Sequence, residues 1–419
     1  MTPQRVVVVG QGYVGLPVAV AAAEAGHAVV GVDLDAERVR RLGEGRSPVG
    51  DVEDAALRAV VDAGTYRAAA GFEAVAEADV VVICVPTPVT DDVPDLSHVR
   101  AAGRAVGERV RRGALVVLES TTYPGTTDEL LAPLLLEASG LRPEDLDVAF
   151  SPERIDPGNA VYGLANTPKV VGASTGRARD RAVAFYETFV ERVVPVSSAG
   201  TAEMAKLLEN TFRHINIALA NEMAIVCRAL GLDVWEVIEA ASTKPFGFMP
   251  FYPGPGVGGH CIPVDPVYLS WKVRQSGGAS KFISLARDVN AGMPGYVVSR
   301  VQEVLNDVGR AVRGARVHVL GLAYKPDVAD LRESPALDVL AGLLRLGAEV
   351  TVSDPYVPDV EVAGAQLKSV DVLPAVASCD LAVVVTAHSA FDLEAVAASA
   401  PLVLDTRGVV PHYPSVHRL

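Results

Sequence analysis

The feature that most constrains the fold of this chain is a glycine-rich turn near its start, placed between two runs of β-branched residues. Arg5–Gly10 (RVVVVG) is a short apolar run that ends at glycine, the pattern of a parallel strand buried on both faces. An alanine-rich helix is expected at Leu16–Ala25, with Gly26 as its stop, and a second buried strand at Ala28–Asp33 (AVVGVD). The chain therefore opens with a predicted βαβ unit.

The turn itself fits the GxGxxG pattern, in which glycines permit a tight turn and a close approach of the backbone to a pyrophosphate at the helix N-terminus. Asp33 lies 18 residues beyond Gly15. Because a carboxylate at this distance accepts from a ribose 2′-hydroxyl and repels a 2′-phosphate, NAD is expected in preference to NADP. The alternative is a glycine turn without a ligand. The predicted cofactor contacts of the turn are Gly10, Gly12, Tyr13, Val14 and Gly15.

Similar apolar runs recur in the first half of the chain, at Asp79–Val85, Leu115–Glu119 and Val148–Phe150. The segments between them are long enough to be helices, so the alternation predicts a doubly wound parallel sheet. From Thr201 to Leu230 the apolar residues follow a helical period instead, which predicts one long connecting helix.

A second βαβ pattern closes the chain. It consists of a strand from Ala315 (ARVHVLGLAY), a helix over about Ser334–Leu346 and a strand over Glu349–Asp354. The expected fold class is α/β, with two Rossmann-like doubly wound domains joined by a long helix and a helical domain. The predicted domain boundaries are 1–198, 199–309 and 310–419.

Length, hydrophobicity and charge exclude several classes of protein. A chain of 419 residues exceeds an ordinary single core, and 50% hydrophobic residues exclude intrinsic disorder. No apolar run is long enough to span a bilayer. The 37 basic and 51 acidic residues give a net charge of −14, which repels nucleic acid. Without a visible export signal or a CxxC pair, we expect reduced thiols, no metal site and a cytoplasmic location.

One cysteine stands in an unusual segment. Lys244–Asp265 (KPFGFMPFYPGPGVGGHCIPVD) holds five prolines, which are expected to exclude regular helix and to leave an ordered or a disordered loop. Glycines there would let a ligand approach, and Cys261 would be presented to it. Taken alone, Cys261 is equally well a nucleophile or a small buried hydrophobe, and we expect a structural role for His260. The other cysteines are expected to be buried: Cys84, Cys227 and Cys379.

Several polar residues could carry chemistry but have plainer alternatives. Lys206 and Asn210 lie four apart on the long helix and could stabilise an oxyanion, although such residues are usually solvated. Glu153 follows a predicted strand, and Asp265 follows Cys261 by four. Carboxylates at such positions can act as bases, although surface acids are commoner. The same alternatives hold at the end of another predicted strand, for Thr121 and Thr122.

Seven motifs stand in a fixed order from the first strand to the last quarter of the chain. They are GxGYVGLP at the start, VICVPTP at 82–88, ESTTYPGTT at 119–127, SPERIDPGN at 151–159, AEMAKLLENTFRHINIALANE at 202–222, PGVGGHCIPVDP at 255–266 and LGLAYKPDVADLRESPA at 320–336. Together they resemble the UDP-glucose/GDP-mannose dehydrogenase family of nucleotide-sugar 6-dehydrogenases.

The resemblance implies a four-electron reaction. Such enzymes oxidise the C6 alcohol of the sugar to a carboxylate in two steps, each passing a hydride to NAD, without releasing the aldehyde. By this resemblance the Cys261 thiolate adds to the aldehyde, and the thiohemiacetal so formed loses the second hydride to become a thioester that water cleaves. The resemblance assigns the oxyanion to Lys206 and Asn210, proton transfer and water activation to Asp265, and the rest of the site to Thr122 and Glu153.

The resemblance also implies binding residues along the whole chain. To the glycine turn and Asp33 it adds, for NAD, Arg38, Pro86, Thr87, Thr121 and Arg332. For the nucleotide sugar, which is expected between the domains, it implies Glu153, Arg154, Lys206, Asn210, Phe251, Tyr252, Gly256, Gly258, Gly259, Lys325 and Arg407. The long helix would form the core of a homodimer or a higher assembly.

Two departures from the UDP-glucose branch bear on the substrate. Pro157 replaces an acidic residue four positions after Glu153, and Lys244–Gly247 replaces an arginine that reaches the sugar across the dimer. The SPERxDPGN and GPGxGGHCIPxDP variants look more like the branch acting on UDP-N-acetylhexosamines, with UDP-N-acetylglucosamine as first candidate. The alternatives are a UDP- or TDP-glucose 6-dehydrogenase of secondary metabolism, a two-electron hydroxyacid dehydrogenase, and a non-catalytic sensor of NAD or a sugar nucleotide.

Overall fold

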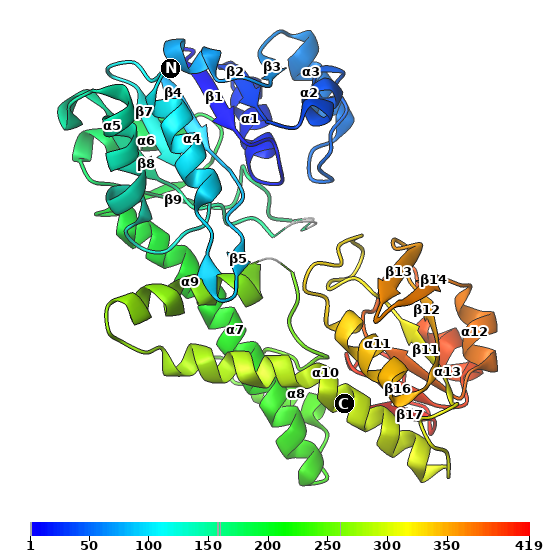
Figure 1. The fold of residues 1–419 in the computed structure, drawn as a ribbon. Helices are drawn as coiled ribbons and strands as arrows, with labels where there is room; N and C mark the ends of the chain where they lie inside the picture. Colours follow the sequence, from blue (N-terminus) through cyan, green and yellow to red (C-terminus); the bar gives the residue numbers. More distant parts are fainter. Residues whose placement is uncertain (1, 157–158, 160, 260) are drawn as a thin grey trace. The chain divides into compact units, whose positions relative to one another are not determined.

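The computed structural model describes residues 2–156, 159, 161–259 and 261–419 (Figure 1). The chain divides into two compact units, one formed by residues 1–209 and 267–278 and the other by residues 210–266 and 279–419. The helices α7 (Ala199–Ala229) and α9 (Cys261–Gln275) contribute residues to both units, and α7 confirms the predicted long helix. Pro157 and His260, which the sequence analysis singled out, lie outside the described residues.

Among the described residues, the first unit forms an eight-stranded sheet in the order β10-β9-β8-β7-β4-β1-β2-β3. Neighbouring strands run parallel except β8 and β9, which are antiparallel. Later strands are added on both sides of β1, which confirms the predicted doubly wound sheet. The strands are β1 (Arg5–Val9), β2 (Ala28–Val32), β3 (Tyr66–Ala69), β4 (Val80–Ile83), β7 (Leu115–Leu118), β8 (Asp147–Phe150), β9 (Lys169–Ala173) and β10 (Val193–Pro195).

Helices cover both faces of this sheet, which explains why its central strands are unbroken apolar runs. Val6 and Val8 of β1 share a core with buried residues of α1 and α6, while α4 and α5 pack on each other over the opposite face (Figure 1). The helices of this unit are α1 (Gly15–Glu24), α2 (Ala36–Gly43), α3 (Asp54–Asp62), α4 (Ser97–Gly107), α5 (Ala132–Ser139) and α6 (Gly176–Tyr186). Short elements between them are η1 (Glu73–Glu77), β5 (Val89–Thr90), β6 (Val93–Pro94), η2 (Thr127–Leu131) and η3 (Pro143–Asp145).

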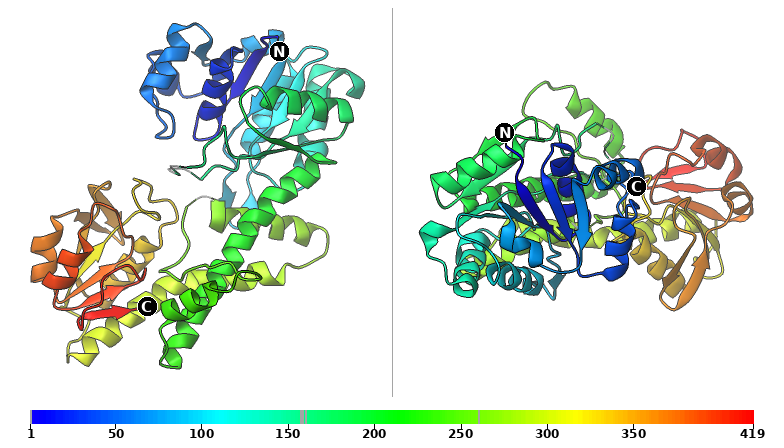
Figure 2. Two further views of the ribbon diagram at one scale, coloured as in Figure 1. Left: turned by 180° about the vertical axis from the view of Figure 1, so that it is seen from behind. Right: turned by 90° about the horizontal axis from the view of Figure 1, so that it is seen from above.

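The described part of the second unit carries a five-stranded parallel sheet in the order β12-β11-β15-β16-β17, which confirms the second Rossmann-like domain. Helices lie on both sides of it (Figure 2): Val317 and Val319 share a core with α10 and α11, and Leu320 shares one with α12 and α13. The strands are β11 (Arg316–Leu320), β12 (Glu349–Ser353), β15 (Leu381–Val384), β16 (Val403–Asp405), β17 (Val416–Arg418) and the hairpin β13 (Asp359–Val362) and β14 (Ala365–Lys368). The helices are α8 (Val234–Ser242), α10 (Lys281–Asp307), α11 (Pro335–Leu346), α12 (Val372–Ser378) and α13 (Leu393–Ser399).

Both sheets repeat one hydrogen-bonding arrangement where their first strand ends. The amide of Gln11, after β1, donates to the carboxylate of Asp33, after β2 (2.9 Å). The amide of Leu322, after β11, donates to the carboxylate of Asp354, after β12 (2.7 Å). Asp354 is therefore the counterpart of Asp33 in the second unit, although the second turn lacks the GxGxxG motif.

The prediction of a loop throughout Lys244–Asp265 is wrong at its end. Helix α9 begins at Cys261 and contains Pro263 and Pro266. Pro263 lies in the first turn, where backbone amides have no acceptor within the helix, and Pro266 removes one helical hydrogen bond. The helix tolerates both prolines, so Cys261 stands at a helix N-terminus and not in a loop.

Within the described ranges, no helix is long and apolar enough to cross a membrane. The side chains in these ranges also form no group of three or more His, Cys, Asp or Glu residues able to hold a metal ion. The boundaries predicted for three domains, 1–198, 199–309 and 310–419, stay a prediction.

Candidate active site

The glycine-rich turn lies at the carboxyl end of β1, the edge of a parallel sheet where ligands of such folds bind. Gly10 has a φ of 90°, and a Cβ there would overlap the carbonyl oxygen of Cys84. A Cβ on Gly15 would overlap the carbonyl oxygen of Gly10. By contrast, nothing lies within 4 Å of the place that a Cβ on Gly12 would take. Packing therefore requires Gly10 and Gly15, while the space beside Gly12 is open.

Asp33 lies beside this turn with its carboxylate largely buried, at 9% exposure. Its Oδ2 accepts from the amide of Gln11 (2.9 Å) and from the guanidinium of Arg38 (3.0 Å), and its Oδ1 accepts from the amide of Asp35 (3.0 Å). A carboxylate held in this place can accept a ribose hydroxyl. The first unit thus brings together these predicted cofactor residues: Gly10, Gly12, Tyr13, Val14, Gly15, Asp33 and Arg38.

The residues after β4 and β7 form the next part of this edge. Pro86 and Thr87 follow β4, and the hydroxyl of Thr87 donates to the carbonyl of Thr121, after β7 (2.8 Å). Tyr268, fully buried, donates its hydroxyl to the carbonyl of Thr87. No sequence signal indicated Tyr268, because α9 was not predicted. Thr122 is 1% exposed, and its hydroxyl oxygen has no hydrogen-bond partner among the described residues.

Glu153 follows β8 on the same edge and contacts the long helix. The ammonium group of Lys206 donates to the backbone carbonyl of Glu153, and both side chains are buried. The carboxylate of Glu153 accepts from the amide of Ile155 (2.6 Å). The guanidinium of Arg154 is turned to the carboxylate of Glu209 (2.7 Å). The structure therefore brings Lys206 to the backbone of Glu153 and pairs Arg154 with an acid.

In the second unit, two of the predicted catalytic residues lie at the start of α9, and a third, Asn210 of α7, contacts one of them. Cys261 is exposed as the first residue of this helix, and Asp265 lies one turn later on the same helix face. The amide of Asn210 donates to Oδ2 of Asp265 at 2.5 Å, and both side chains are buried. A thiolate is stabilised at a helix N-terminus. The other three cysteines are buried, as predicted.

The loop before α9 holds aromatic pairs. Phe251 packs edge-on against Phe212 (5.6 Å between ring centroids), and Tyr252 stacks on Trp235 (5.8 Å, 12° between planes). Trp235 belongs to α8, a helix that was not predicted, so its role in this loop carried no sequence signal. The two pairs order the loop between α8 and α9.

The glycines of this loop are required by packing within the second unit. A Cβ on Gly258 or on Gly259 would come within 2.6 or 2.8 Å of side-chain atoms of Tyr324. Gly256 has a φ of 137°, which residues with a side chain rarely adopt, and a Cβ there would lie 3.0 Å from Pro335. The glycines let the loop approach the segment between β11 and α11. From the sequence, they were expected to let a ligand approach the loop instead.

A pocket of about 690 Å³ lies beside this loop, within the second unit. Tyr252 and Arg407, both predicted to bind substrate, line it together with Trp235 and Pro326. The Nε of Arg407 donates to the carbonyl of Val385 (2.7 Å), and burial lowers the pKa of Arg407 to about 10. The guanidinium therefore stays positive at neutral pH. The pocket offers stacking surfaces and cations, which suit a nucleotide, and its lining also carries the acids Asp233, Glu236 and Glu239.

Two further predicted residues lie on the segment between β11 and α11. Lys325 is half-buried and precedes Pro326 of the pocket. The exposed guanidinium of Arg332 pairs with Asp330 (2.6 Å). Arg332 belongs to the second unit, whereas the other predicted cofactor residues belong to the first.

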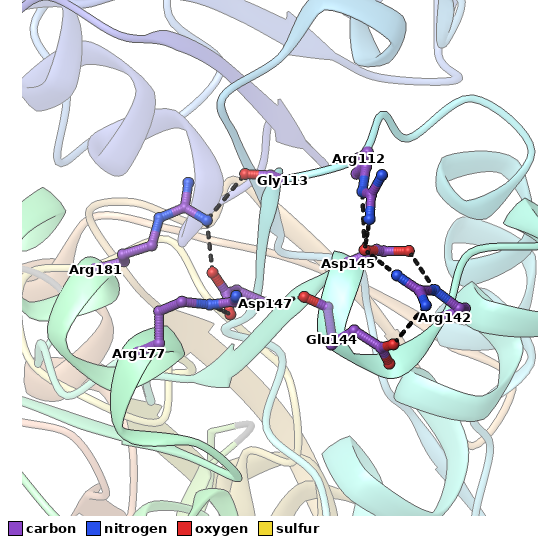
Figure 3. Close-up of a pocket in the computed structure, with 8 residues that line it drawn as sticks. All are labelled: Arg112, Gly113, Arg142, Glu144, Asp145, Asp147, Arg177 and Arg181. Carbon is purple, nitrogen blue, oxygen red and sulfur yellow. Dashed lines mark hydrogen bonds and ion pairs between the residues drawn. The ribbon is translucent and has the colours of Figure 1, made fainter.

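Another pocket, of about 480 Å³, lies in the first unit and is lined by charged side chains (Figure 3). Asp147 begins β8, so this pocket lies at the amino ends of the strands, opposite the glycine turn. Asp147 is 2% exposed and accepts from Arg177 (2.8 Å) and Arg181 (2.6 Å). Arg112 and Arg142 pair in the same way with Asp145. Each guanidinium drawn in Figure 3 is paired with a carboxylate, which accounts for this cluster without a ligand.

The fold and these residues define a protein that binds a dinucleotide in its first unit and carries a second Rossmann-like unit. Three models of the UDP-glucose/GDP-mannose dehydrogenase family match the chain in order: the NAD binding domain at residues 4–190, the central domain at 200–292 and the UDP binding domain at 318–412. The chain belongs to this family and is an NAD-dependent oxidoreductase of the nucleotide-sugar dehydrogenase class.

Individual relatives match over nearly the whole chain. The NDP-N-acetyl-D-galactosaminuronic acid dehydrogenase of Ralstonia solanacearum is 36% identical over 96% of this chain and 95% of its own length. The UDP-N-acetyl-D-mannosamine dehydrogenase of Pyrococcus horikoshii is 39% identical over 84% of each chain. A solved structure of the UDP-D-ManNAc dehydrogenase of Pyrococcus horikoshii superposes with a TM-score of 0.90 at 35% identity, covering 99% of this chain and 98% of the other. The names of these relatives are those of dehydrogenases of N-acetylated nucleotide sugars.

Proposed function

We propose that the protein oxidises the C6 alcohol of a UDP-N-acetylhexosamine to the uronate, with two NAD reduced and one water consumed per sugar. The observation that carries this proposal is the start of α9, where the exposed Cys261 shares a helix face with Asp265, itself held by Asn210. A two-electron alcohol dehydrogenase has no use for a thiol presented in this way. The glycine turn and Asp33 would hold NAD, which accepts a hydride in each oxidation.

The thiol accounts for the retention of the aldehyde. The Cys261 thiolate adds to the aldehyde carbon, so a C–S bond forms and the carbonyl electron pair moves to oxygen. The thiohemiacetal then loses its remaining C6 hydrogen with the bonding pair, which leaves a thioester. Water attacks this thioester and gives up its two protons to solvent, the C–S bond breaks, and the uronate and the thiolate of Cys261 are released. Each step balances without a further oxidant.

The other residues assigned to catalysis would stabilise the charges that these steps create. Lys206 and Asn210 are assigned to the developing oxyanion, and Asn210 also donates to Asp265, which orients a carboxylate able to activate water. The buried hydroxyl of Thr122, which lacks a partner among the described residues, is free to meet a substrate oxygen. Glu153 completes this set through its contact with Lys206.

The nucleotide is assigned to the pocket of the second unit. Tyr252 can stack on a base, and the cations Arg407 and Lys325 counter a diphosphate in a chain whose net charge is −14. For the sugar, UDP-N-acetylglucosamine is our first candidate from the sequence. The names of the relatives suggest two further candidates, UDP-N-acetyl-D-mannosamine and an N-acetylgalactosamine derivative. UDP- or TDP-glucose is the alternative.

A homodimer is proposed from the long helix. Apolar side chains of α7 are exposed, among them Leu208 (58%), Phe212 (45%) and Leu219 (52%). Large apolar residues gathered on one helix mark a surface that another chain covers. A second copy of the chain fits best, because the resemblance places the dimer core on this helix.

The decisive measurement is the yield of NADH per sugar, with UDP-, TDP- and GDP-sugars assayed side by side. Two equivalents and a uronate product support the proposal. One equivalent, with a released aldehyde or ketone, would instead identify a two-electron dehydrogenase. Tight binding without any turnover across the whole panel would identify a sensor.

A further inference from the structure

The second unit holds a buried histidine that the proposed reaction does not use. His388 follows β15 and is 2% exposed. Its Nε2 lies 2.9 Å from Oδ2 of Asp354, and its Nδ1 lies 3.0 Å from the backbone nitrogen of Asp327. The rings of Tyr356 and Phe391 pack against the imidazole.

These contacts determine the protonation state of the ring. A backbone amide can only donate, so Nδ1 of His388 accepts from Asp327 and carries no proton. Nε2 therefore carries the single proton and donates it to Asp354. A second proton, on Nδ1, would make Nδ1 a donor facing the donor amide of Asp327, and the hydrogen bond between them would be lost.

Asp354 and His388 together hold both ends of one short segment. Oδ2 of Asp354 accepts from the amides of Leu322 and Ala323 at its start (2.7 and 3.2 Å). His388 accepts from the amide of Asp327 at its end. Asp327 needs this support, because its φ of 61° lies in the left-handed region, where a side chain is unfavourable.

The tied segment carries groups assigned to the substrate. Lys325 stands between its two anchored ends, and Pro326 lines the pocket of about 690 Å³. The side chain of Tyr324, in the same segment, occupies the space that side chains at positions 258 and 259 would need. A displacement of this segment would thus alter both the pocket and the loop that leads to α9. None of the residues assigned to NAD lies in it.

We propose that neutral His388 is a positioning residue that holds the segment 322–327 in the form that binds the nucleotide sugar, and that protonation of His388 releases this segment. The inference rests on the proposed function, in which Lys325 meets the diphosphate. The titratable groups that face the imidazole are the carboxylates of Asp354 and Asp327 and the phenol of Tyr356. Oδ1 of Asp327 lies 3.9 Å from Nδ1, so a second proton would draw the ring from the backbone amide toward that carboxylate.

The test compares the wild-type full-length enzyme with two variants, His388→Asn and His388→Gln. Asparagine keeps an acceptor near the position of Nδ1 but cannot take up a proton, whereas glutamine keeps a donor near Nε2 and loses the acceptor. The KM for UDP-N-acetyl-D-mannosamine and the KM for NAD are measured at about pH 8 and about pH 5.5. Each phosphorus of a nucleotide sugar carries one ester, one shared anhydride oxygen and a single strongly acidic hydroxyl, so the charge of this substrate stays constant over the range.

In the wild type, we expect the KM for the nucleotide sugar to rise about threefold to tenfold on going to acid, the effect of one lost hydrogen bond, while the KM for NAD stays nearly constant. His388→Asn should show little change with pH, and His388→Gln should have a raised KM at both values. If the KM for the nucleotide sugar rose equally in acid in the wild type and in His388→Asn, the proposal would be overturned, because the pH dependence would then not come from His388.

Amide hydrogen exchange tests the same segment without turnover. Peptides covering 322–334 should exchange faster at acid pH, relative to the intrinsic rate, in the wild type and not in His388→Asn, with peptides covering 10–15 as control. If the variant fails to fold, the exchange of residues 322–334 in the wild type at the two pH values decides whether acid releases the segment. If exchange responds but no nucleotide sugar is oxidised, the positioning role stands and the proposed function fails. If the sugar is oxidised and exchange shows no response, the positioning role is wrong.

Discussion

Arg38 donates to the same carboxylate oxygen of Asp33 that accepts from the amide of Gln11, at 3.0 Å. The negative charge of Asp33 repels a 2′-phosphate, whereas the guanidinium beside it would attract one. The choice of NAD over NADP therefore depends on the carboxylate outweighing its cationic neighbour.

Asp33→Asn should relax this choice. Loss of the charge leaves an oxygen for the amide of Gln11 and frees Arg38 to meet a 2′-phosphate. We expect the ratio of kcat/KM for NADP to that for NAD to rise about 10-fold to 100-fold, the value of one charge-assisted hydrogen bond. The double variant with Arg38→Ala should lose this gain. An unchanged ratio in Asp33→Asn would contradict the assignment.

Cys261→Ser should separate the two oxidations. The hydroxyl is a poor nucleophile at neutral pH, so the rate of uronate formation should fall about a thousandfold or more, while slow formation of one NADH continues. The measurement is the uronate and NADH yield in single-turnover assays. Cys227→Ser, a change at a buried position of α7, should retain the reaction. Uronate production at the wild-type rate by Cys261→Ser would refute the covalent role.

The second unit holds two buried histidines, and we expect acid to lower the free energy of unfolding because of them. Burial lowers the pKa of both His214 and His318 to about 4, from 6.5, with a contribution from the charge of Arg287 at His214. Between these values the unfolded chain binds protons that the folded chain does not. The free energy of unfolding should therefore fall as the pH drops from about 6.5 toward about 4, while these groups contribute no pH dependence above that range.

His318→Val removes one of these groups and should flatten the decline by about 1–3 kcal/mol over this range. Urea unfolding followed by tryptophan fluorescence at several pH values measures the slope. The matched control is His412→Gln, a change at an exposed histidine. An unaltered slope in His318→Val would show that the buried imidazole is not the cause.

Asp147→Asn tests the ion-pair cluster of Figure 3. Arg177 and Arg181 are 57% and 33% exposed in their side chains and can turn to solvent, so we expect a loss of only about 1–2 kcal/mol in the free energy of unfolding. Glu144→Gln, at an exposed position, should change stability by less than about 0.5 kcal/mol. The KM for NAD should stay unchanged, because the cluster lies at the amino ends of the strands. A raised KM in the folded variant would show a functional role for the cluster.

The parts of this protein that sequence reasoning predicted correctly have local signals. The runs that became β1 and β2 are buried on both faces after their exposed first residues, so Val6–Val9 and Val29–Val32 are apolar, and the crowding at Gly10 and Gly15 permits no side chain. The helix start at Cys261 was missed because prolines were counted as helix breakers without regard to where in a helix they fall. In the first turn a proline removes no hydrogen bond.

By itself, the sequence determined the two α/β halves, the cofactor turn and the acid at Asp33, since each depends on neighbours within one βαβ unit. Only the tertiary structure decided that Asn210 meets Asp265, 55 residues away, and that His388 accepts from Asp327, 61 residues away. No periodicity encodes such pairs, because they arise when separately formed helices and strands pack. The chemistry of the candidate site depends on these long-range contacts, which is why its residues could be named from the sequence but their partners could not.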